Sequence, residues 1–332
     1  MKNIIEEDIT FVIQGAVNRE DTQKTISSIK KFFPKSYIIL STWEGSNVSD
    51  FEVNEVILNK DPNGFKYFFN SEVSNNVNRQ ITSTINGLKK VKTKYAFKIR
   101  TDFILTGNSF LKYFDEFEKY NNDYKIFKHK VITSTFITRN PKCKKFPYPF
   151  HVSDFCFFGL TEDLIDLFDI PLVDKEEQNY FLEHKGIKNP NNFICRYAAE
   201  QTIMINWLKK YKNIDCKYYN DNSEKNIKLT EQFIVNNFIL LNWKQFDINT
   251  LKFYLTKLKS RLEANICYTY LDYTKLYKKL CDNEYKTKFI DTEFLEILIS
   301  KVRRFLLKPI ANLICMFIKN KDLKAKIRLK LY

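Results

Sequence analysis

Short apolar runs alternate with helix-like segments over the first hundred residues of this 332-residue chain. Runs rich in Val, Ile, Phe and Tyr are typical of buried strands, and apolar residues three or four positions apart indicate helices that bury one face. Strands that alternate with helices build βαβ units, whose strands are parallel. We therefore predict an α/β fold around a buried parallel sheet. The predicted strands are residues 10–16, 37–42, 55–59 and 95–99, and the predicted helices are residues 18–33 and 75–90.

The rest of the chain continues this pattern and then becomes mostly helical. From about residue 229 onward, helical spacing of apolar residues dominates. We therefore predict a first domain over residues 1–220 and a mostly helical region over residues 221–332. Between them, the predicted elements are a helix at 109–120, strands at 125–137 and 154–158, and a helix at 191–210.

The composition fits a globular protein in a reducing compartment. Hydrophobic residues make up 44% of the chain, and 30 Phe and 19 Tyr supply material for a core, which excludes wholesale disorder. The seven cysteines are scattered and form no C-x-x-C pair, so neither a disulfide framework nor a zinc site is indicated. The first ten residues are acidic and lack the apolar stretch of a secretory signal. We therefore expect a cytoplasmic protein.

Most of the positive charge lies at the end of the chain. The formal net charge is +15, and residues 301–332 hold ten Lys or Arg against one acid. This concentration favours an anionic surface over nucleic acid, for which the chain has no recognised module. Residues 305–318 are apolar, are too few to span a bilayer, and are flanked by Arg303, Arg304 and Lys319. Two alternatives stay open: an amphipathic helix on anionic lipid, and a helix packed against the main domain.

Polar residues gather where the predicted strands end. Gln14 and Gly15 lie at the end of the first strand, and Arg100 and Asp102 follow the fourth. Ligands of parallel sheets bind beyond the carboxyl ends of the strands, so these residues predict a ligand site. The chain has no Walker A loop and no G-x-G-x-x-G, H-E-x-x-H or G-x-S-x-G motif. These absences exclude the simplest kinase, dehydrogenase, zinc protease and α/β-hydrolase interpretations.

The residues around Asp102 suit a phosphorylated ligand. A strand-end carboxylate can hold a divalent cation against a diphosphate, and the guanidinium of Arg100 or Arg79 can pair with phosphate oxygens directly. Asn78 and Arg79 lie at a predicted helix start, where backbone N–H groups attract anions. The alternatives are that Asp102 caps a turn and that Asn75 or a neighbouring asparagine caps the helix.

Two further positions are candidates for acid–base chemistry. His151, Ser153 and Asp154 precede a very apolar strand, and His151 or Asp154 could bond a substrate hydroxyl or take its proton. Glu200 lies among small residues in a predicted helix, where a carboxylate could act as a general base. The alternatives are a structural histidine and an ordinary glutamate on a helix surface.

Several of these segments, in this order, resemble the WavE-type lipopolysaccharide-synthesis proteins. The resemblance covers about residues 10–210, nearly two thirds of the chain. The matching segments are FVIQGAV (11–17), IILSTWEGS (38–46), VILNKDP (56–62), NNVNRQITSTINGLK (75–89), KYAFKIRTD (94–102), TRN (138–140) and PFHVSDFCFFGL (149–160).

The resemblance implies a GT-A-like glycosyltransferase with a Rossmann-type mixed sheet flanked by helices and a nucleotide-sugar site within residues 1–220. Asp102 would take the place of the last acid of the D-x-D motif, with Arg100 where the first Asp would stand. Either Asp102 holds Mg²⁺ or Mn²⁺ with one carboxylate, or Arg100 supplies the positive charge itself. The implied donor-binding residues are Gln14, Gly15, Asn78, Arg79, Arg100 and Asp102.

The implied reaction transfers a sugar from a nucleotide-sugar to a lipid-linked saccharide in lipopolysaccharide, lipooligosaccharide or capsule synthesis. Glu200 and Asp154 are the two candidate catalytic bases, with Glu200 preferred, and His151 and Ser153 would contact the acceptor. The basic C-terminal segment would hold the enzyme on the cytoplasmic face of the inner membrane. Two alternatives remain: a phosphotransferase or nucleotidyltransferase on the same scaffold, and a non-catalytic scaffold in surface-glycan assembly.

Overall fold

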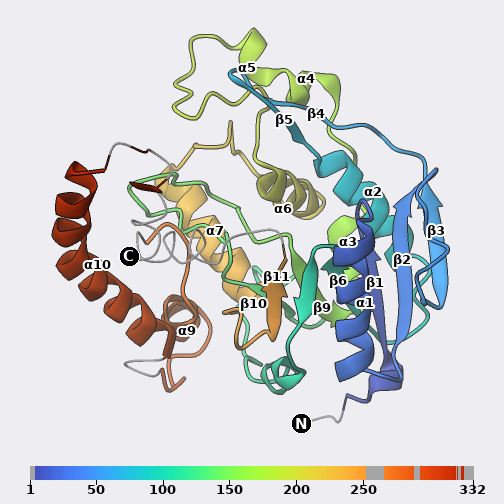
Figure 1. The fold of residues 1–332 in the computed structure, drawn as a ribbon. Coiled ribbons are helices and arrows are strands. Elements are labelled where there is room, and N and C mark those ends of the chain that lie inside the picture. The colour runs from blue at the N-terminus through green and yellow to red at the C-terminus, as the bar shows by residue number, and fades with distance from the viewer. Residues whose placement is uncertain (1–3, 252–264, 288–291, 319, 321–322, 325–332) are drawn as a thin grey trace.

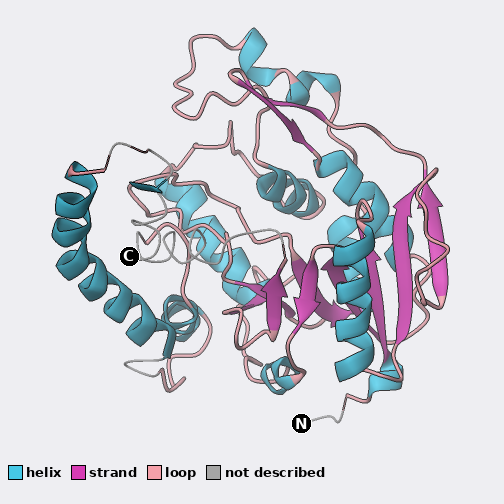
Figure 2. Ribbon diagram, in the orientation of Figure 1, coloured by secondary structure: helices cyan, strands magenta, loops and turns pink. Residues whose placement is uncertain are grey.

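A seven-stranded sheet lies at the centre of the molecule, with helices on both of its faces (Figures 1 and 2). The structure is a computed structural model that describes residues 4–251, 265–287, 292–318, 320 and 323–324. The strands of the sheet are β1 (Ile9–Gln14), β2 (Tyr37–Trp43), β3 (Glu55–Asn59), β6 (Tyr95–Arg100), β8 (Val131–Ser134), β9 (Cys156–Leu160) and β10 (Phe238–Leu241). Their order across the sheet is β10-β8-β9-β6-β1-β2-β3.

The sheet is mixed, which confirms the fold class that the resemblance implies. β3, β2, β1 and β6 are parallel neighbours, as the alternation of strands and helices predicts. β9 runs antiparallel to β6 and β8, and β10 is parallel to β8. The chain order reverses at β1, because β2 and β3 lie on one side of it and β6 lies on the other. In such sheets the crevice beyond the carboxyl ends of the two strands at the reversal is where ligands bind.

Helices cover the two faces of the sheet. In α1, the Asn18 side chain accepts a hydrogen bond from the Asp21 N–H and so begins the helix at the residue that follows it. α2 lies on the opposite face, where Gly87 allows close approach because an added Cβ would collide with Val12 of β1. The helices are α1 (Arg19–Phe32), α2 (Val77–Leu88), α3 (Thr161–Phe168), α4 (Lys175–Gln178), α5 (Tyr180–Glu183), α6 (Ala199–Lys209), α7 (Glu224–Asn237), α9 (Tyr270–Leu280) and α10 (Thr292–Met316), with short 3-10 helices at Glu6–Asp8 and Ser109–Tyr113.

Two small antiparallel pairs complete the strands. β7 (Phe103–Leu105) pairs with β11 (Ile248–Thr250), and β4 (Phe65–Phe68) pairs with β5 (Ser71–Asn75). The β4–β5 hairpin lies with α4 and α5 at the end of the molecule towards which β2 and β3 point (Figure 1). The sequence did not predict this hairpin, because β5 carries one apolar residue and so lacks the pattern of a half-buried strand.

Three predicted elements are shorter than expected. Residues 125–137 contain only β8, because the Asp163 carboxylate accepts the N–H groups of Lys128 and His129 and so replaces strand pairing there. Residues 109–120 form only the 3-10 helix at Ser109–Tyr113. The predicted helix at 191–210 begins at Ala199, where α6 starts.

The chain beyond residue 220 shares the core of the main sheet. β10 is a strand of that sheet, and the Phe246 ring stacks on Phe97 of β6 with 5.4 Å between ring centroids. The boundary predicted near residue 220 therefore falls between segments that pack in one hydrophobic core. α7 packs on β10 and α9, and α10 lies at the edge of the molecule, away from the sheet (Figure 1).

The seven cysteines are free thiols, and six of them are buried. Burial raises the pKa of the Cys156 and Cys195 thiols to about 12, so both stay protonated and unreactive at neutral pH. Among the described residues, no helix combines the length and the apolar character that crossing a bilayer requires.

Candidate functional site

The candidate site lies at the carboxyl ends of β1 and β6, where the chain order of the sheet reverses. Gly15 follows β1 with a φ of 119°, a backbone conformation that favours glycine, and its N–H donates to the Ser41 carbonyl of β2. Thr101 follows β6, its N–H donates to the Gln14 carbonyl, and its hydroxyl donates to the Ala16 carbonyl. These hydrogen bonds hold the ends of the two strands side by side as a rigid edge.

Gln14, at the end of β1, presents an amide donor at this edge. The Gln14 side chain is buried, and its Oε1 accepts a hydrogen bond of 2.9 Å from the Ser83 hydroxyl of α2. That bond fixes the amide orientation, and Nε2 has no hydrogen-bond partner among the described residues. The amide group is therefore available to a ligand.

Arg100 and Asp102 form a bidentate pair just beyond β6. The Nε of Arg100 lies 2.8 Å from Oδ1 of Asp102, and Nη2 lies 2.8 Å from Oδ2. The guanidinium also stacks on the Phe155 ring, with 5.2 Å between its central carbon and the ring centroid. Both side chains are partly shielded, being 26% and 10% exposed, so the pair is less screened by solvent than a surface pair. Arg100 is thus held in a fixed orientation at the crevice.

Asp154 brings a second carboxylate to this pair. Its backbone carbonyl accepts from the buried ammonium of Lys98 and from Gln80 Nε2, which anchors the segment before β9. Its carboxylate is nearly inaccessible, and Oδ1 is buried with no hydrogen-bond partner among the described residues. A buried acceptor without a donor costs about 1–3 kcal/mol, which a ligand hydroxyl would offset once the segment before β9 moves enough to expose Oδ1.

Lys98 adds a buried positive charge below Arg100 on the same strand. Burial lowers the pKa of Lys98 to about 8, while the nearby Asp154 carboxylate favours the charged form. The Lys98 ammonium lies 5.8 Å from the centroids of the Phe157 and Phe168 rings. This ammonium donates to the carbonyls of Asp154 and Phe155 and so holds the segment before β9 to the sheet. Because Lys98 is fully buried, it does not contact a ligand directly.

The residues at Asp102 do not fit a divalent cation in this arrangement. Both carboxylate oxygens of Asp102 accept hydrogen bonds from Arg100, so a cation there would have to displace or share a guanidinium. Within the part of the chain that the structure describes, no group of three or more His, Cys, Asp or Glu residues is placed to hold a metal ion. We therefore derive no chemical step through Mg²⁺ or Mn²⁺, and Arg100 is the cation that this site offers.

Two of the side chains predicted to bind a diphosphate, Arg79 and Asn78, form hydrogen bonds with other residues of the protein. Arg79 of α2 donates to both carboxylate oxygens of Asp61, at 2.8 and 2.7 Å, and the pair is about one-third exposed. Asn78 is buried, and its amide exchanges two hydrogen bonds with the backbone of Val173. Arg79 remains at the surface of the crevice side of α2, whereas Asn78 serves to join α2 to the segment before α4.

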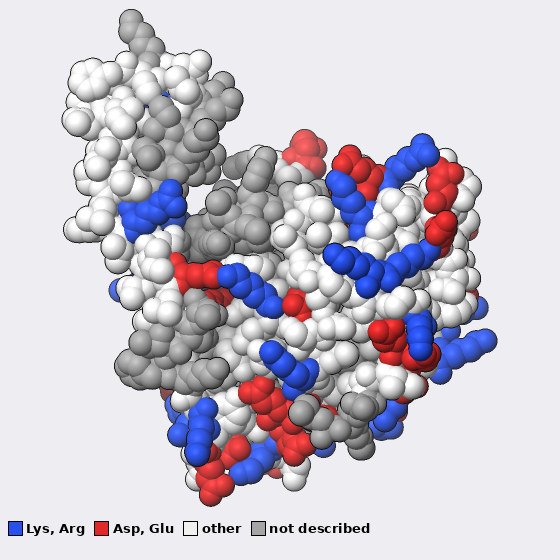
Figure 3. All heavy atoms as spheres, turned by 60° about the horizontal axis from the view of Figure 1, so that its bottom comes forward, with Lys and Arg blue, Asp and Glu red and all other residues white. Residues whose placement is uncertain are grey.

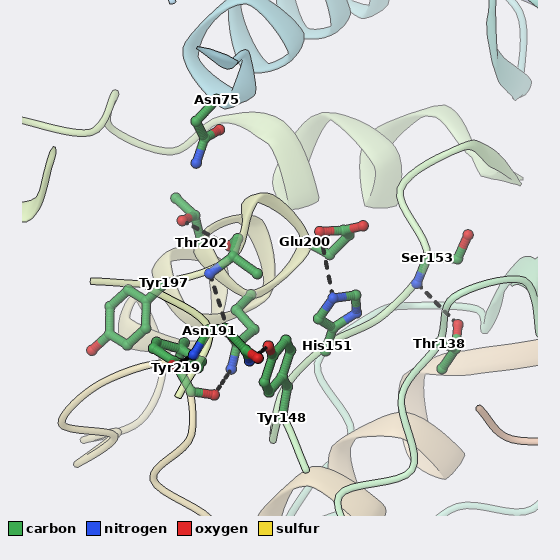
Figure 4. A network of polar contacts seen from close by, with 12 residues as sticks. Asn75, Thr138, Tyr148, His151, Ser153, Asn191, Tyr197, Glu200, Thr202 and Tyr219 are labelled. Atoms are coloured by element: carbon green, nitrogen blue, oxygen red, sulfur yellow. Dashed lines mark hydrogen bonds and ion pairs between the residues drawn. The ribbon is translucent and has the colours of Figure 1, made fainter. Parts of the chain in front are cut away.

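His151 and Glu200, which lie far apart in the sequence, face each other (Figure 4). His151 Nε2 lies 3.5 Å from Glu200 Oε2, and the Glu200 side chain is 14% exposed. Glu200 is in the first turn of α6, where the helix dipole stabilises a negative charge. The pair therefore presents an oriented carboxylate, which is what a general base requires.

Gln201, the neighbour of Glu200, fixes the start of α6. Its Oε1 accepts from the Ala198 N–H, and its Nε2 donates to the carbonyls of Pro149 and Tyr219. Because Pro149 is two residues before His151, this side chain sets the spacing between the histidine loop and the Glu200 helix.

Ser153 has a structural position. It is fully buried, its hydroxyl bonds to the Ser134 hydroxyl of β8 at 3.1 Å, and its N–H donates to the Thr138 hydroxyl at 2.9 Å (Figure 4). The predicted acceptor contact therefore has no accessible atom on this side chain, and we assign Ser153 to holding the His151 loop against β8.

Sequence reasoning missed an aromatic group beside Glu200. Tyr148 lies 5.8 Å from His151 between ring centroids, and its hydroxyl bonds to the Asn191 side chain (Figure 4). Tyr219 packs edge-on against Tyr148. The available signal was the density of aromatic residues at 146–150, although their relation to residue 219 depends on the tertiary fold.

The fold and the site together define a mixed α/β protein with polar side chains gathered at the carboxyl edge of its sheet, where ligands of such sheets bind. The chain matches the family described as WavE lipopolysaccharide synthesis over residues 9–307. It therefore belongs to that family, which confirms the resemblance, and the family places it in lipopolysaccharide synthesis. The match extends well beyond residue 210 and takes in the first half of α10. No curated protein matches the chain.

Proposed function

We propose that this chain is a glycosyltransferase that moves a sugar from a nucleotide-sugar donor to a saccharide acceptor in lipopolysaccharide synthesis. The observation that carries the proposal is the Arg100–Asp102 pair, oriented by two hydrogen bonds at the strand-end crevice beside the Asp154 carboxylate. A fixed guanidinium suits a diphosphate leaving group, because it can pair with two oxygens as their charge develops.

The donor would lie across the ends of β1 and β6. Gln14 Nε2 and the open backbone at Gly15 are suited to the nucleotide, and Arg100 is suited to the diphosphate. Arg79 would reach a phosphate only by releasing Asp61, so its contribution depends on that exchange. In this arrangement the protein supplies the positive charge from its own side chain.

The acceptor would enter between the donor and the His151–Glu200 pair. A bond forms between the acceptor oxygen and the anomeric carbon of the donor sugar, while the bond from that carbon to the diphosphate oxygen breaks. The proton of the acceptor hydroxyl passes to a carboxylate. Glu200 is the preferred base because His151 orients it, and Asp154 is the alternative because it has an unfilled acceptor atom.

Donor binding is tested directly by thermal shift with UDP-, GDP-, CMP- and dTDP-sugars, each with Mn²⁺ and with EDTA. We expect one nucleotide class to raise the melting temperature, because a ligand at 100 times its Kd stabilises the fold by about 2.7 kcal/mol. We also expect the shift to survive EDTA, because Arg100 takes the place of the cation. Arg100→Gln should lose the shift.

The control for this panel is Lys89→Gln, which removes a surface cation paired with Asp169 at the C-terminal end of α2 and should leave the shift unchanged. A protein that none of the nucleotide-sugars stabilises would contradict a donor site. Release of free phosphate or of a nucleotidyl product, in place of a glycosylated acceptor, would point to phosphoryl or nucleotidyl transfer.

We also propose that α10 docks the protein on the cytoplasmic face of the inner membrane. An apolar stripe runs along its outer side, with every member between 44% and 80% exposed. At about 100° per residue these side chains fall on one side of the helix, centred on Val302. The stripe consists of Leu295, Leu298, Ile299, Val302, Phe305, Leu306, Ile310, Leu313 and Met316.

Charge along α10 matches an anionic lipid surface. Lys301 and Lys308 flank the apolar stripe on one side of the helix, and Arg303 flanks it on the other. In the space-filling view the described side chains of the lobe at the upper left are mostly uncharged, with a basic group at its base, whereas the rest of this face mixes basic and acidic side chains (Figure 3). This exposure favours the lipid alternative over a helix buried on the main domain. The basic tail at 325–332 lies outside the described residues.

Membrane docking is tested by sedimentation with phosphatidylcholine vesicles with and without phosphatidylglycerol. We expect binding to require the anionic lipid, and Phe305→Ser to weaken it by about tenfold, since burying a Phe contributes about 1.5–3 kcal/mol. Leu182→Ser is the control, because Leu182 of α5 is also an exposed apolar residue, at 44%, but lies far from α10 (Figure 1). Equal vesicle binding by Phe305→Ser and the unaltered protein would refute the proposal.

A further inference from the structure

Two nitrogens of the Arg139 guanidinium have no hydrogen-bond acceptor among the described residues. Arg139 follows β8 by five residues, and its N–H donates to the His151 carbonyl, so its backbone is joined to the loop of the candidate base. Its Nε and Nη1 are buried and have no hydrogen-bond partner, and its side chain forms no ion pair within the described residues. Each such buried donor costs about 1–3 kcal/mol, and an unpaired charge adds to that cost.

Two aromatic rings hold the Arg139 guanidinium in place. Its central carbon lies 5.6 Å from the ring centroid of Phe146 and 5.6 Å from that of Tyr148. Stacking of this kind orients the planar group while leaving its edge free for hydrogen bonds. The geometry is therefore that of a preformed anion site without its anion.

Tyr148 connects this guanidinium to the candidate base. The charges of both Arg139 and Glu200 act on the Tyr148 hydroxyl, and burial, the largest effect on that group, keeps its pKa well above the usual range. Arg139 and Glu200 therefore both lie near one tyrosine. An acceptor whose hydroxyl reaches Glu200 can present a neighbouring anionic group to Arg139.

The surrounding loop adds positive charge and lies next to α10. Residues 139–150 contain Lys142, Lys144 and Lys145 and no acid. Cys143 in this loop is in one apolar cluster with Ile297 of α10. The loop therefore lies between the candidate base and the helix proposed to rest on lipid.

We propose that Arg139 binds an anionic group, a phosphate or a carboxylate, carried by the saccharide acceptor. This proposal rests on the proposed function for the existence of an acceptor, but its binding test needs no donor. Two parallel N–H···O bonds from the Nη1–Nη2 edge would satisfy the buried Nη1 and fix the acceptor relative to Glu200.

Calorimetric titration of the full chain with glucose 1-phosphate, glucuronate and glucose tests the site. We expect one or both of the charged sugars to bind, with the better one identifying phosphate or carboxylate, and glucose to bind much more weakly. Arg139→Gln should weaken the charged sugar by about tenfold or more, and Arg139→Lys should restore part of the affinity. The melting temperature of Arg139→Gln should stay close to that of the unaltered protein, because the variant loses two ring contacts but also removes two buried, unpaired donors.

The matched control is Arg196→Gln. Arg196 also stacks between two rings, Tyr180 and Tyr197, but its Nε donates to the Lys217 carbonyl and its charge faces Glu177. Its replacement should leave sugar-phosphate affinity unchanged.

Nucleotide titrations separate this proposal from the donor site. Equal nucleotide affinity in Arg139→Gln and in the unaltered protein supports an acceptor role. Loss of nucleotide affinity in that variant would assign Arg139 to the donor and overturn the proposal. Unchanged charged-sugar affinity in Arg139→Gln, or no charged-sugar binding by the unaltered protein, would overturn it as well.

Discussion

We expect Glu200→Gln to lower the rate of sugar transfer by about 10²- to 10⁴-fold while the protein stays folded, because a glutamine cannot accept the acceptor proton. Glutamine has the same shape and can still bond to His151, so the loop and α6 should keep their places. Donor affinity should be unchanged, since the proposed donor contacts are made by Arg100 and Gln14 and not by Glu200. The measurement is kcat and KM for transfer, with donor Kd from the thermal-shift panel.

Asp154→Asn distinguishes the two candidate bases. Asp154 is held mainly through its backbone carbonyl, so asparagine should preserve the contacts to Lys98 and Gln80. If Glu200 is the base, Asp154→Asn should lower transfer far less than Glu200→Gln. A larger loss in Asp154→Asn would assign the proton transfer to Asp154 instead.

The control for these variants is Glu177→Gln. Glu177 lies on α4, and its side chain is 17% exposed, close to the 14% of Glu200. It faces Arg196 and Lys209 instead of His151. Its loss should change stability and leave the transfer rate per folded molecule unaltered. Retention of full activity by Glu200→Gln and by Asp154→Asn alike would exclude a carboxylate base at this site.

Four strands of the sheet were predictable because each can be recognised from its own local sequence. β1, β2, β3 and β6 are short apolar runs separated by helical spacing, and their parallel pairing follows from βαβ connectivity. Residues 125–137 and 154–158 were also predicted to hold strands, but the limits of β8 and β9 and the antiparallel direction of β9 were not predictable from spacing. Their limits depend on long-range hydrogen bonds, such as those from Lys128 and His129 to Asp163.

The site was predictable as a set of positions but not as a set of contacts. Strand ends placed Gln14, Arg100 and Asp102 at one edge of the sheet, which is a consequence of topology alone. The sequence could not show that Arg100 binds Asp102, or that the Asn78 amide is used by Val173. Both depend on side-chain directions that the fold decides after the strands are in place.

The proposed role of Arg139 could not be predicted from the sequence either. As a residue in a loop it carried no pattern beyond its place in a family-like segment. The inference that Arg139 binds an anion depends on two observations. The rings of Phe146 and Tyr148, 7 and 9 residues further along the chain, stack on its guanidinium, and the described residues provide no acidic partner for it. Only packing reveals such a group.

Asp102→Ala should lower the rate of transfer by about 10²- to 10³-fold. The Arg100 guanidinium, which stabilises the leaving diphosphate, would no longer be held in a fixed orientation. Arg100 keeps its charge in this variant, so donor affinity should fall less than kcat. Arg100→Gln removes the charge itself and should reduce both. The double variant should be little worse than Arg100→Gln alone, because the two side chains act as one unit.

A metal-dependent site would give a different pattern. If Asp102 held a divalent cation, EDTA would abolish transfer by the unaltered protein, and Arg100→Gln would retain activity that responds to Mn²⁺. Asp166→Ala controls for folding, since the Asp166 carboxylate accepts from Trp207, Tyr211 and Lys210 outside the crevice. That variant should lose stability but keep its transfer rate per folded molecule. If Asp102→Ala transfers sugar at the rate of the unaltered protein, the Arg100–Asp102 pair has no role in the mechanism. An unoriented Arg100 would then serve as well as an oriented one.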